Sequence, residues 1–220
     1  MFEHFSELFF FLDLAAFLAV IGLHLVKKTT HLIGLYAIQS FAVAALLFSF
    51  GIVEGEPSLL WIGVLTLAIK AFAAPIFFSR LMKRFGAQFA TNNYLSMPIT
   101  LAVLMGLVMI SYSQIFQPLN ALLPEAVGSI SFNFAIVFIA MFLMINRRGV
   151  FAQMIGILSL ENGIVLLAAL IGIQQPLALE IGIIFDIVVW IAIGSAFIGM
   201  IHRQFGSLDT KELRHLTEED

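Results

Sequence analysis

The chain has no cysteine, few charged residues and no excess of basic ones. The absence of cysteine excludes disulfides, thiolate metal sites and cysteine-bound iron–sulfur clusters. Charged side chains make up 11% of the 220 residues, against about 25% in an average soluble domain. The 11 Lys and Arg are outnumbered by 14 Asp and Glu, so no basic surface is expected for a nucleic-acid backbone. These shortages exclude a soluble enzyme domain, a disordered chain and a nucleic-acid-binding protein.

Hydrophobic residues are abundant instead. They make up 61% of the chain, which includes 23 Phe, and the mean hydropathy is +1.04. A soluble domain of this size still exposes much of its surface, and it could not keep so much apolar area away from water. The composition therefore indicates an integral membrane protein.

The apolar residues fall into runs long enough to cross a bilayer, for which about 20 residues at 1.5 Å each are needed. The predicted spans are Phe5–Val26, His31–Val53, Leu59–Arg80, Tyr94–Phe116, Val127–Ile145, Val150–Gly172 and Ala178–Ile201. Most of the breaks between them are too short to hold a soluble domain. The sequence thus predicts an all-α, multi-pass membrane protein with seven transmembrane helices.

The orientation follows from the basic residues, which favour the cytoplasmic side of a membrane protein. In a seven-span arrangement, ten of the eleven Lys and Arg fall on one side. They are Lys27, Lys28, Arg80, Lys83, Arg84, Arg147, Arg148, Arg203, Lys211 and Arg214. We therefore expect the amino terminus outside, the carboxyl terminus in the cytoplasm, and the chain in the cytoplasmic (inner) membrane.

Four ionisable residues remain inside the predicted spans. Lys70 and Glu161 lie at the centres of the third and sixth spans, while Asp13 and Asp186 lie about 4–5 Å from their own span centres. Each costs about 2.5–3.5 kcal/mol at the middle of a membrane helix, and such residues usually mark a proton or ion path or a charge pair. Desolvation disfavours the charged forms of both lysine and carboxyl groups, so a buried set of them can exchange protons. The alternative is a structural Lys–Glu pair that only fixes helix register.

Other polar residues of the spans are candidates for supporting roles. Pro75 follows Lys70 by five residues and is expected to kink the helix, freeing the Ala71 carbonyl to hold water. His24 faces the same side of its helix as Asp13 and could lead protons toward it, although a lone His near a span end is commonly interfacial. Gln39 and Asn162 could bind water, or more simply tie helices together.

Motifs for other chemistry are missing. The sequence has no glycine-rich phosphate loop and no arrangement of Ser, His and Asp for nucleophilic catalysis. Its histidines lack the spacing of metal or haem ligands. We therefore predict no catalytic residue, no cofactor site and no metal site on this chain.

Several short motifs, taken in order, resemble the hydrogenase-4 component E family, the membrane subunits of formate-hydrogenlyase-type complexes. The motifs are Tyr36-Ala37-Ile38-Gln39-Ser40, Lys70 with Pro75, Ser159-Leu160-Glu161-Asn162-Gly163, Glu180-Ile181-Gly182 followed by Asp186, and Gly206-Ser207-Leu208-Asp209. The motifs occur in the same order, spacing and span positions, and the similarity extends over nearly the whole chain. The Glu-Asn-Gly and Glu-Ile-Gly…Asp motifs are the most specific.

The last three spans also resemble the K subunit of respiratory complex I and the C subunit of Mrp-type antiporters. Arg147-Arg148, Ile155-Gly156 and Asn162 fit that pattern, while Glu161 and Asp186 each lie about one turn from a membrane glutamate of the K subunit. The resemblance divides the chain into a four-helix part (1–126), a K-like three-helix part (127–201) and a cytoplasmic tail (202–220).

The resemblance implies a non-catalytic membrane-arm subunit of a complex-I-like nickel–iron hydrogenase, a component of an oxidoreductase complex with no redox centre of its own. The nickel–iron centre and the iron–sulfur clusters would lie on partner subunits. The expected partners are antiporter-like membrane subunits, a heel membrane subunit, the large and small hydrogenase subunits, and lipids.

Three functions stay open at this point. In the first, the chain contributes to proton translocation coupled to electron transfer, with Lys70 and Glu161 as central relay groups. Asp186 would then link to a neighbouring subunit, and Asp13 with His24 would form an inlet or connecting branch. In the second, the chain belongs to an Mrp-type cation/proton antiporter complex without redox chemistry. In the third, it is a structural scaffold of the membrane arm.

Overall fold

The computed structural model describes residues 2–85, 93–116 and 127–170, together with single residues between 184 and 199. Within these ranges, six helices are long and apolar enough to cross a membrane. Five of these spans are single helices: α1 (Phe2–Leu25), α2 (Thr29–Glu54), α5 (Met97–Ser111), α7 (Val127–Asn146) and α8 (Val150–Leu170). The remaining one, third along the chain, consists of α3 (Pro57–Leu65), η1 (Thr66–Ala73) and α4 (Ala74–Phe85). A short 3₁₀ turn, η2 (Gln114–Phe116), follows α5.

The chain is therefore an all-helical membrane protein in the part that the structure describes, as the sequence predicts. Six of the seven predicted spans are confirmed within a few residues at their ends. The regular part of the fourth span is shorter than predicted, because α5 begins at Met97 and ends at Ser111 rather than extending over Tyr94–Phe116. Most of the predicted seventh span, Ala178–Ile201, and the tail 202–220 lie outside the described residues, so the seven-span count and the orientation remain predictions.

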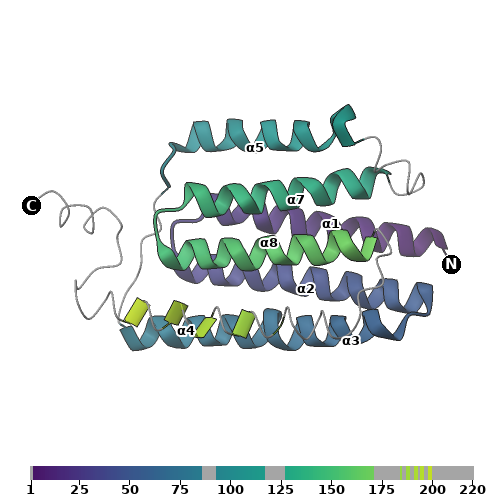
Figure 1. Cartoon of the computed structure of the whole chain (residues 1–220), viewed down its shortest axis with the longest axis horizontal. Coiled ribbons are helices and arrows are strands. Elements are labelled where there is room, and N and C mark those ends of the chain that lie inside the picture. The colour runs from purple at the N-terminus through teal and green to yellow at the C-terminus, as the bar shows by residue number, and fades with distance from the viewer. Residues whose placement is uncertain are drawn as a thin grey trace, which may run out of the picture.

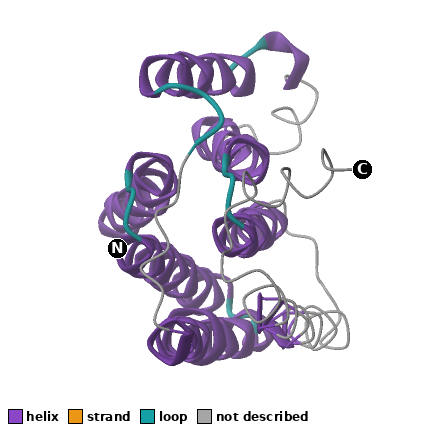
Figure 2. Cartoon of the chain, turned by 90° about the vertical axis from the view of Figure 1, so that its left-hand side faces the viewer, coloured by secondary structure: helices purple, strands orange, loops and turns teal. Residues whose placement is uncertain are grey.

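Four helices form the centre of the bundle. α7 packs along α8, α1 along α2, and the two pairs meet through α1 against α7 and α2 against α8. The third span packs mainly on α2, and α5 packs mainly on α7 at the opposite edge of the molecule (Figures 1 and 2). Helices from both sides of the predicted boundary at residue 126 thus share one core, and the division into parts stays a prediction.

Small residues let the two central helices α7 and α8 approach closely. A Cβ atom at Gly156 would lie 2.8 Å from Cγ of Met144, and one at Gly163 would lie 3.1 Å from Cγ2 of Val137. These glycines are seven residues apart and so face the same helix. Contacts of small residues are the usual means of helix association in a bilayer, where no hydrophobic force drives one helix onto another.

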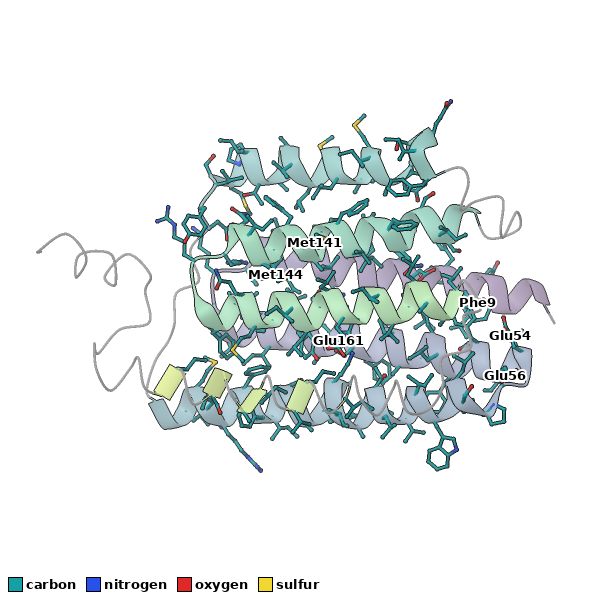
Figure 3. All side chains as sticks on the ribbon, in the orientation of Figure 1. Phe9, Glu54, Glu56, Met141, Met144 and Glu161 are labelled. Carbon is teal, nitrogen blue, oxygen red and sulfur yellow. The ribbon has the colours of Figure 1, made fainter. Side chains whose placement is uncertain are left out.

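A glycine also ends α2 and turns the chain into the third span. Gly55 has φ = 68°, a left-handed conformation that favours glycine, and its N–H donates to the carbonyl of Gly51. Pro57 then occupies the first turn of α3, where a missing N–H removes no helical bond. This turn places Glu54 and Glu56 at the same end of the bundle as the amino terminus (Figure 3).

The opposite end is held together by polar contacts around the α7–α8 turn. The guanidinium of Arg147 donates to the carbonyls of Leu23 and Val26, the latter at 2.8 Å, and so binds the last turn of α1. The side chain of Asn146 accepts from the N–H of Leu95 at 3.0 Å and donates to Thr100 at 3.2 Å, which binds the start of α5. The turn therefore joins α1, α5, α7 and α8.

Arg147 departs from the expectation that basic residues beside the spans lie at the cytoplasmic surface. Its side chain is 1% exposed. Burial lowers the pKa of Arg147 to about 10, which still leaves the guanidinium charged at neutral pH. A positive group at the carboxyl end of α1 also complements the helix dipole. Arg147 is consequently a structural cation at the end of the bundle.

Candidate functional site

A buried ion pair lies at the middle of the bundle. Nζ of Lys70, on η1, is 3.2 Å from Oε1 of Glu161, on α8, and their side chains are 3% and 20% exposed. Each residue lies within about 1 Å of the midpoint of its span, counted at 1.5 Å per residue. Figure 3 shows Glu161 directed from α8 toward the third span. The two residues predicted as central relay groups are therefore in contact.

Lys70 belongs to a π-helical segment, in which backbone N–H groups bond to carbonyls five residues back. The N–H of Ala74 donates to Ile69, and the next bond in this series would need an N–H at residue 75. Pro75 has none, so the π register cannot continue beyond this point. Segments of this kind widen a helix locally and are frequent at functional sites.

The π register changes which carbonyl Pro75 leaves without a donor. The sequence predicts the Ala71 carbonyl, which is the acceptor opposite residue 75 in a regular α-helix. In the π register the acceptor opposite residue 75 is the Lys70 carbonyl, and the Ala74 N–H that would otherwise reach it bonds Ile69 instead. A backbone acceptor of Lys70 itself is thus left for water close to the ion pair.

Two polar contacts between α2 and α8 flank the pair. Oγ of Ser159 donates to Oε1 of Gln39 at 2.7 Å, and Nδ2 of Asn162 donates to Oγ of Ser40 at 2.8 Å. All four side chains are fully buried. Ser159 and Asn162 lie on the same turns of α8 as Glu161, so the two contacts fix the rotation of α8 against α2 and with it the direction of the carboxylate. Gln39 and Asn162 therefore tie helices together, the simpler of their two predicted uses.

Tyr36 adds a hydroxyl to this layer. The residue is fully buried one turn before Ser40, and it lies within electrostatic range of Glu161. The polar groups near Glu161 thus include the Lys70 ammonium, the Tyr36 hydroxyl and the hydrogen-bonded side chains between α2 and α8.

Asp13 and His24 do not share a contact, although both face α7 as their common helix face predicts. Oδ1 of Asp13 is 3.5 Å from Nδ2 of Asn133, while Nε2 of His24 lies 3.0 Å from the Ile139 carbonyl. The His24 ring also stacks on Phe142, with ring centroids 5.1 Å apart. Eleven residues of helix, about 16 Å, separate the two on α1.

Asp186 lies outside the described residues, and its predicted link to a neighbouring subunit remains a prediction. Among the described residues, no group of three or more His, Asp or Glu is placed to hold a metal ion.

Sequence reasoning missed three residues that matter here. Ser159 and Asn133 were each a polar residue inside an apolar run, a signal that marks a helix contact but does not name its partner. The sequence presents Arg147 as a cytoplasmic charge and as part of a motif shared with the K subunit. No local pattern shows that its side chain turns back toward the carbonyls of α1.

The chain is similar to a small number of known proteins. An uncharacterized protein of Mycobacterium tuberculosis, Rv0085, is 29% identical over 189 residues, which cover 85% of this chain and 86% of that protein. Hydrogenase-4 component E of Escherichia coli is 24% identical over 191 residues, 83% of this chain and 85% of that protein, and the same holds for hydrogenase-4 component E of Shigella flexneri. No family model and no solved structure matches.

Proposed function

We propose that this chain is a membrane subunit of a hydrogenase complex of the hydrogenase-4 type, and that its Lys70–Glu161 pair takes part in moving protons through the membrane arm. The similarity to hydrogenase-4 component E over 83% of the chain supports the first part. The buried ion pair at mid-membrane depth supports the second.

The ion pair is the observation on which the proposed mechanism depends. A lysine and a glutamate in contact can exist as an ion pair or, after transfer of one proton, as two neutral groups. Burial penalises both charges, which brings the two forms closer in free energy than they are in water. The pair can therefore take up a proton from a neighbouring group and later release it. The π register supports this role, since it leaves the Lys70 carbonyl available to a water molecule.

The proposal places the redox chemistry elsewhere. A nickel–iron centre and iron–sulfur clusters would belong to the large and small hydrogenase subunits, and this chain would bind none. Its neighbours in the inner membrane would be antiporter-like subunits and a heel subunit. Each charge moved against 100 mV requires about 2.3 kcal/mol, which the redox reaction of the partners would supply.

Purification in a mild detergent through a carboxyl-terminal tag, followed by mass spectrometry, tests the partnership. We expect nickel–iron hydrogenase subunits to co-purify with the chain. Co-purification with antiporter-like subunits and no metal-binding subunits would contradict this proposal and favour the antiporter complex. A complex that forms with Lys70 replaced by Met and still pumps normally would favour the scaffold.

A further inference from the structure

A second buried carboxyl group lies away from the Lys70–Glu161 pair, where α1 meets α7. Asp13 is 5% exposed, and its Oδ1 is 3.5 Å from Nδ2 of Asn133, which is fully buried. Unlike Glu161, Asp13 has no ion-pair partner among the residues that the structure describes. A carboxylate inside a membrane without a positive partner is unfavourable.

The amide of Asn133 has a fixed orientation. Its Nδ2 also donates to the carbonyl of Ser129 at 2.9 Å, and only the NH₂ group of an amide can make that bond. The other amide atom, Oδ1, is buried and accepts no hydrogen bond from the described part of the chain. A buried acceptor left in this state is destabilising, because it has lost its hydrogen bonds to water without gaining another.

The protonation state of Asp13 decides whether that acceptor can be satisfied. A carboxylate has no hydrogen to donate, whereas a neutral carboxylic acid has one. A neutral Asp13 can accept from Nδ2 of Asn133 through one oxygen and donate to Oδ1 through the other. One added proton thus removes a charge from the membrane interior and provides a donor for the amide.

Polar groups lead from this pair toward one surface. Counted along their spans, Asp13, Asn133 and Tyr112 lie about 4–5, 6 and 8 Å from the midpoint, all displaced toward the end that holds the amino terminus. Tyr112 follows the last residue of α5, is 55% exposed, and lies within electrostatic range of Asp13. Its hydroxyl can both donate and accept a hydrogen bond.

We propose that Asp13 and Asn133 form a second proton-holding site, in which the amide of Asn133 binds Asp13 as the neutral acid and Tyr112 lies between this site and the surface on the amino-terminal side. His24 is not part of this site. The use of the held proton in translocation rests on the proposed function above, but the protonation of Asp13 does not.

Infrared spectroscopy of the full-length chain in lipid vesicles at neutral pH tests the protonation. In the difference between wild type and D13N, we expect the loss of one protonated-carboxyl band. N133L is expected to shift that band, because it removes the amide partner. E54Q is the matched control, since Glu54 is exposed at the end of α2 and should remove only carboxylate bands. Loss of carboxylate bands alone in D13N would overturn the proposal.

Chemical labelling of the wild type covers the case in which D13N does not fold. Dicyclohexylcarbodiimide reacts with a protonated carboxyl group. The O–H of the acid adds across one carbon–nitrogen double bond of the carbodiimide, and migration of the acyl group from oxygen to nitrogen then gives a stable N-acylurea without loss of atoms. We expect mass spectrometry to find this product at Asp13 and not at Glu54. An unmodified Asp13 would count against the proposal. Both experiments are independent of hydrogenase partners, so their failure is distinguishable from failure of the proposed function.

Discussion

Lys70 and Glu161 meet across the interface of the third span and α8, with Nζ and Oε1 3.2 Å apart at the middle of the membrane-spanning bundle. Lys70 comes from a π-helical segment that Pro75 terminates, and Glu161 comes from a helix whose rotation is fixed by two hydrogen bonds to α2. The pair is thus oriented from both sides by the backbone and side chains around it.

Single substitutions of Lys70 and Glu161 test whether the pair acts as a proton relay or only as a structural contact. K70M leaves Glu161 without its cation, and E161Q leaves Lys70 without its anion. Removing one partner of a buried pair typically costs about 3–5 kcal/mol. We expect each single variant to lower the yield of folded protein and to abolish proton pumping by the assembled complex in vesicles.

The double variant K70M/E161Q provides the control. It removes both charges, so we expect the yield to return toward that of the wild type while proton pumping stays absent. A single-variant control at the exposed Glu54, E54Q, should change neither quantity. Recovery of pumping together with yield in the double variant would show that the pair is only structural.

Pro75 offers a second test, because its missing N–H ends the π register. In P75A the new N–H can bond the Lys70 carbonyl or return the segment to an α register, and a net hydrogen bond contributes about 0.5–1.5 kcal/mol. We expect higher thermal stability together with slower proton pumping, since the Lys70 carbonyl loses its place for water and the lysine side chain is redirected.

The matched control for this variant is P57A. Pro57 lies in the first turn of α3, where an N–H has no helical partner in any case, and its side chain is exposed. We expect P57A to change neither the pumping rate nor the position of Lys70. Unchanged pumping in P75A would contradict a functional role for the π segment.

The comparison of sequence and structure shows what residue patterns can reveal in a membrane protein. The six described spans could be predicted because each needs a long apolar run, and Lys70 and Glu161 could be matched because span centres share a depth. Depth alone does not say which helices are neighbours, so their contact could not be predicted. The same limit applies to Asp13, which shares a helix face with His24 but contacts Asn133, 120 residues away.

The hydrogen-bond register of the backbone around Lys70 could not be predicted from the sequence either. Pro75 predicts a break in the helical hydrogen bonds, but it does not say whether the break appears as a kink or as a π segment. In the observed π register the acceptor opposite residue 75 is the Lys70 carbonyl, one residue before the Ala71 carbonyl that a regular α-helix would place there.

The reciprocal contact of Gln39 with Ser159 allows a measurement of helix association. Oγ of Ser159 donates to the Gln39 side chain, whose Nε2 lies 3.4 Å from the Ser159 carbonyl. Hydrogen bonds between membrane helices contribute about 0.6 kcal/mol on average, with a maximum near 1.7 kcal/mol. We expect Q39L and S159A each to destabilise the protein by about that amount. A double-mutant cycle in detergent should then give a coupling energy of the same size, and additive effects would show that the two side chains do not interact.

Arg147 provides a final test, of how the end of the bundle is held. Its guanidinium donates to the Leu23 and Val26 carbonyls, and it stays charged at neutral pH because its pKa of about 10 lies well above that value. R147M removes the donors of two carbonyls at the end of α1, and an unsatisfied buried group costs about 1–3 kcal/mol. We therefore expect R147M to lower the thermal unfolding temperature markedly. R147K keeps the charge but lacks the planar fork of donors, so its unfolding temperature should fall between those of R147M and the wild type.

The exposed Arg80 gives the matched control, because R80M removes a basic residue at the same end of the bundle without removing a buried contact. Equal unfolding temperatures of R147M and R80M would show that the contribution of Arg147 is one of surface charge alone.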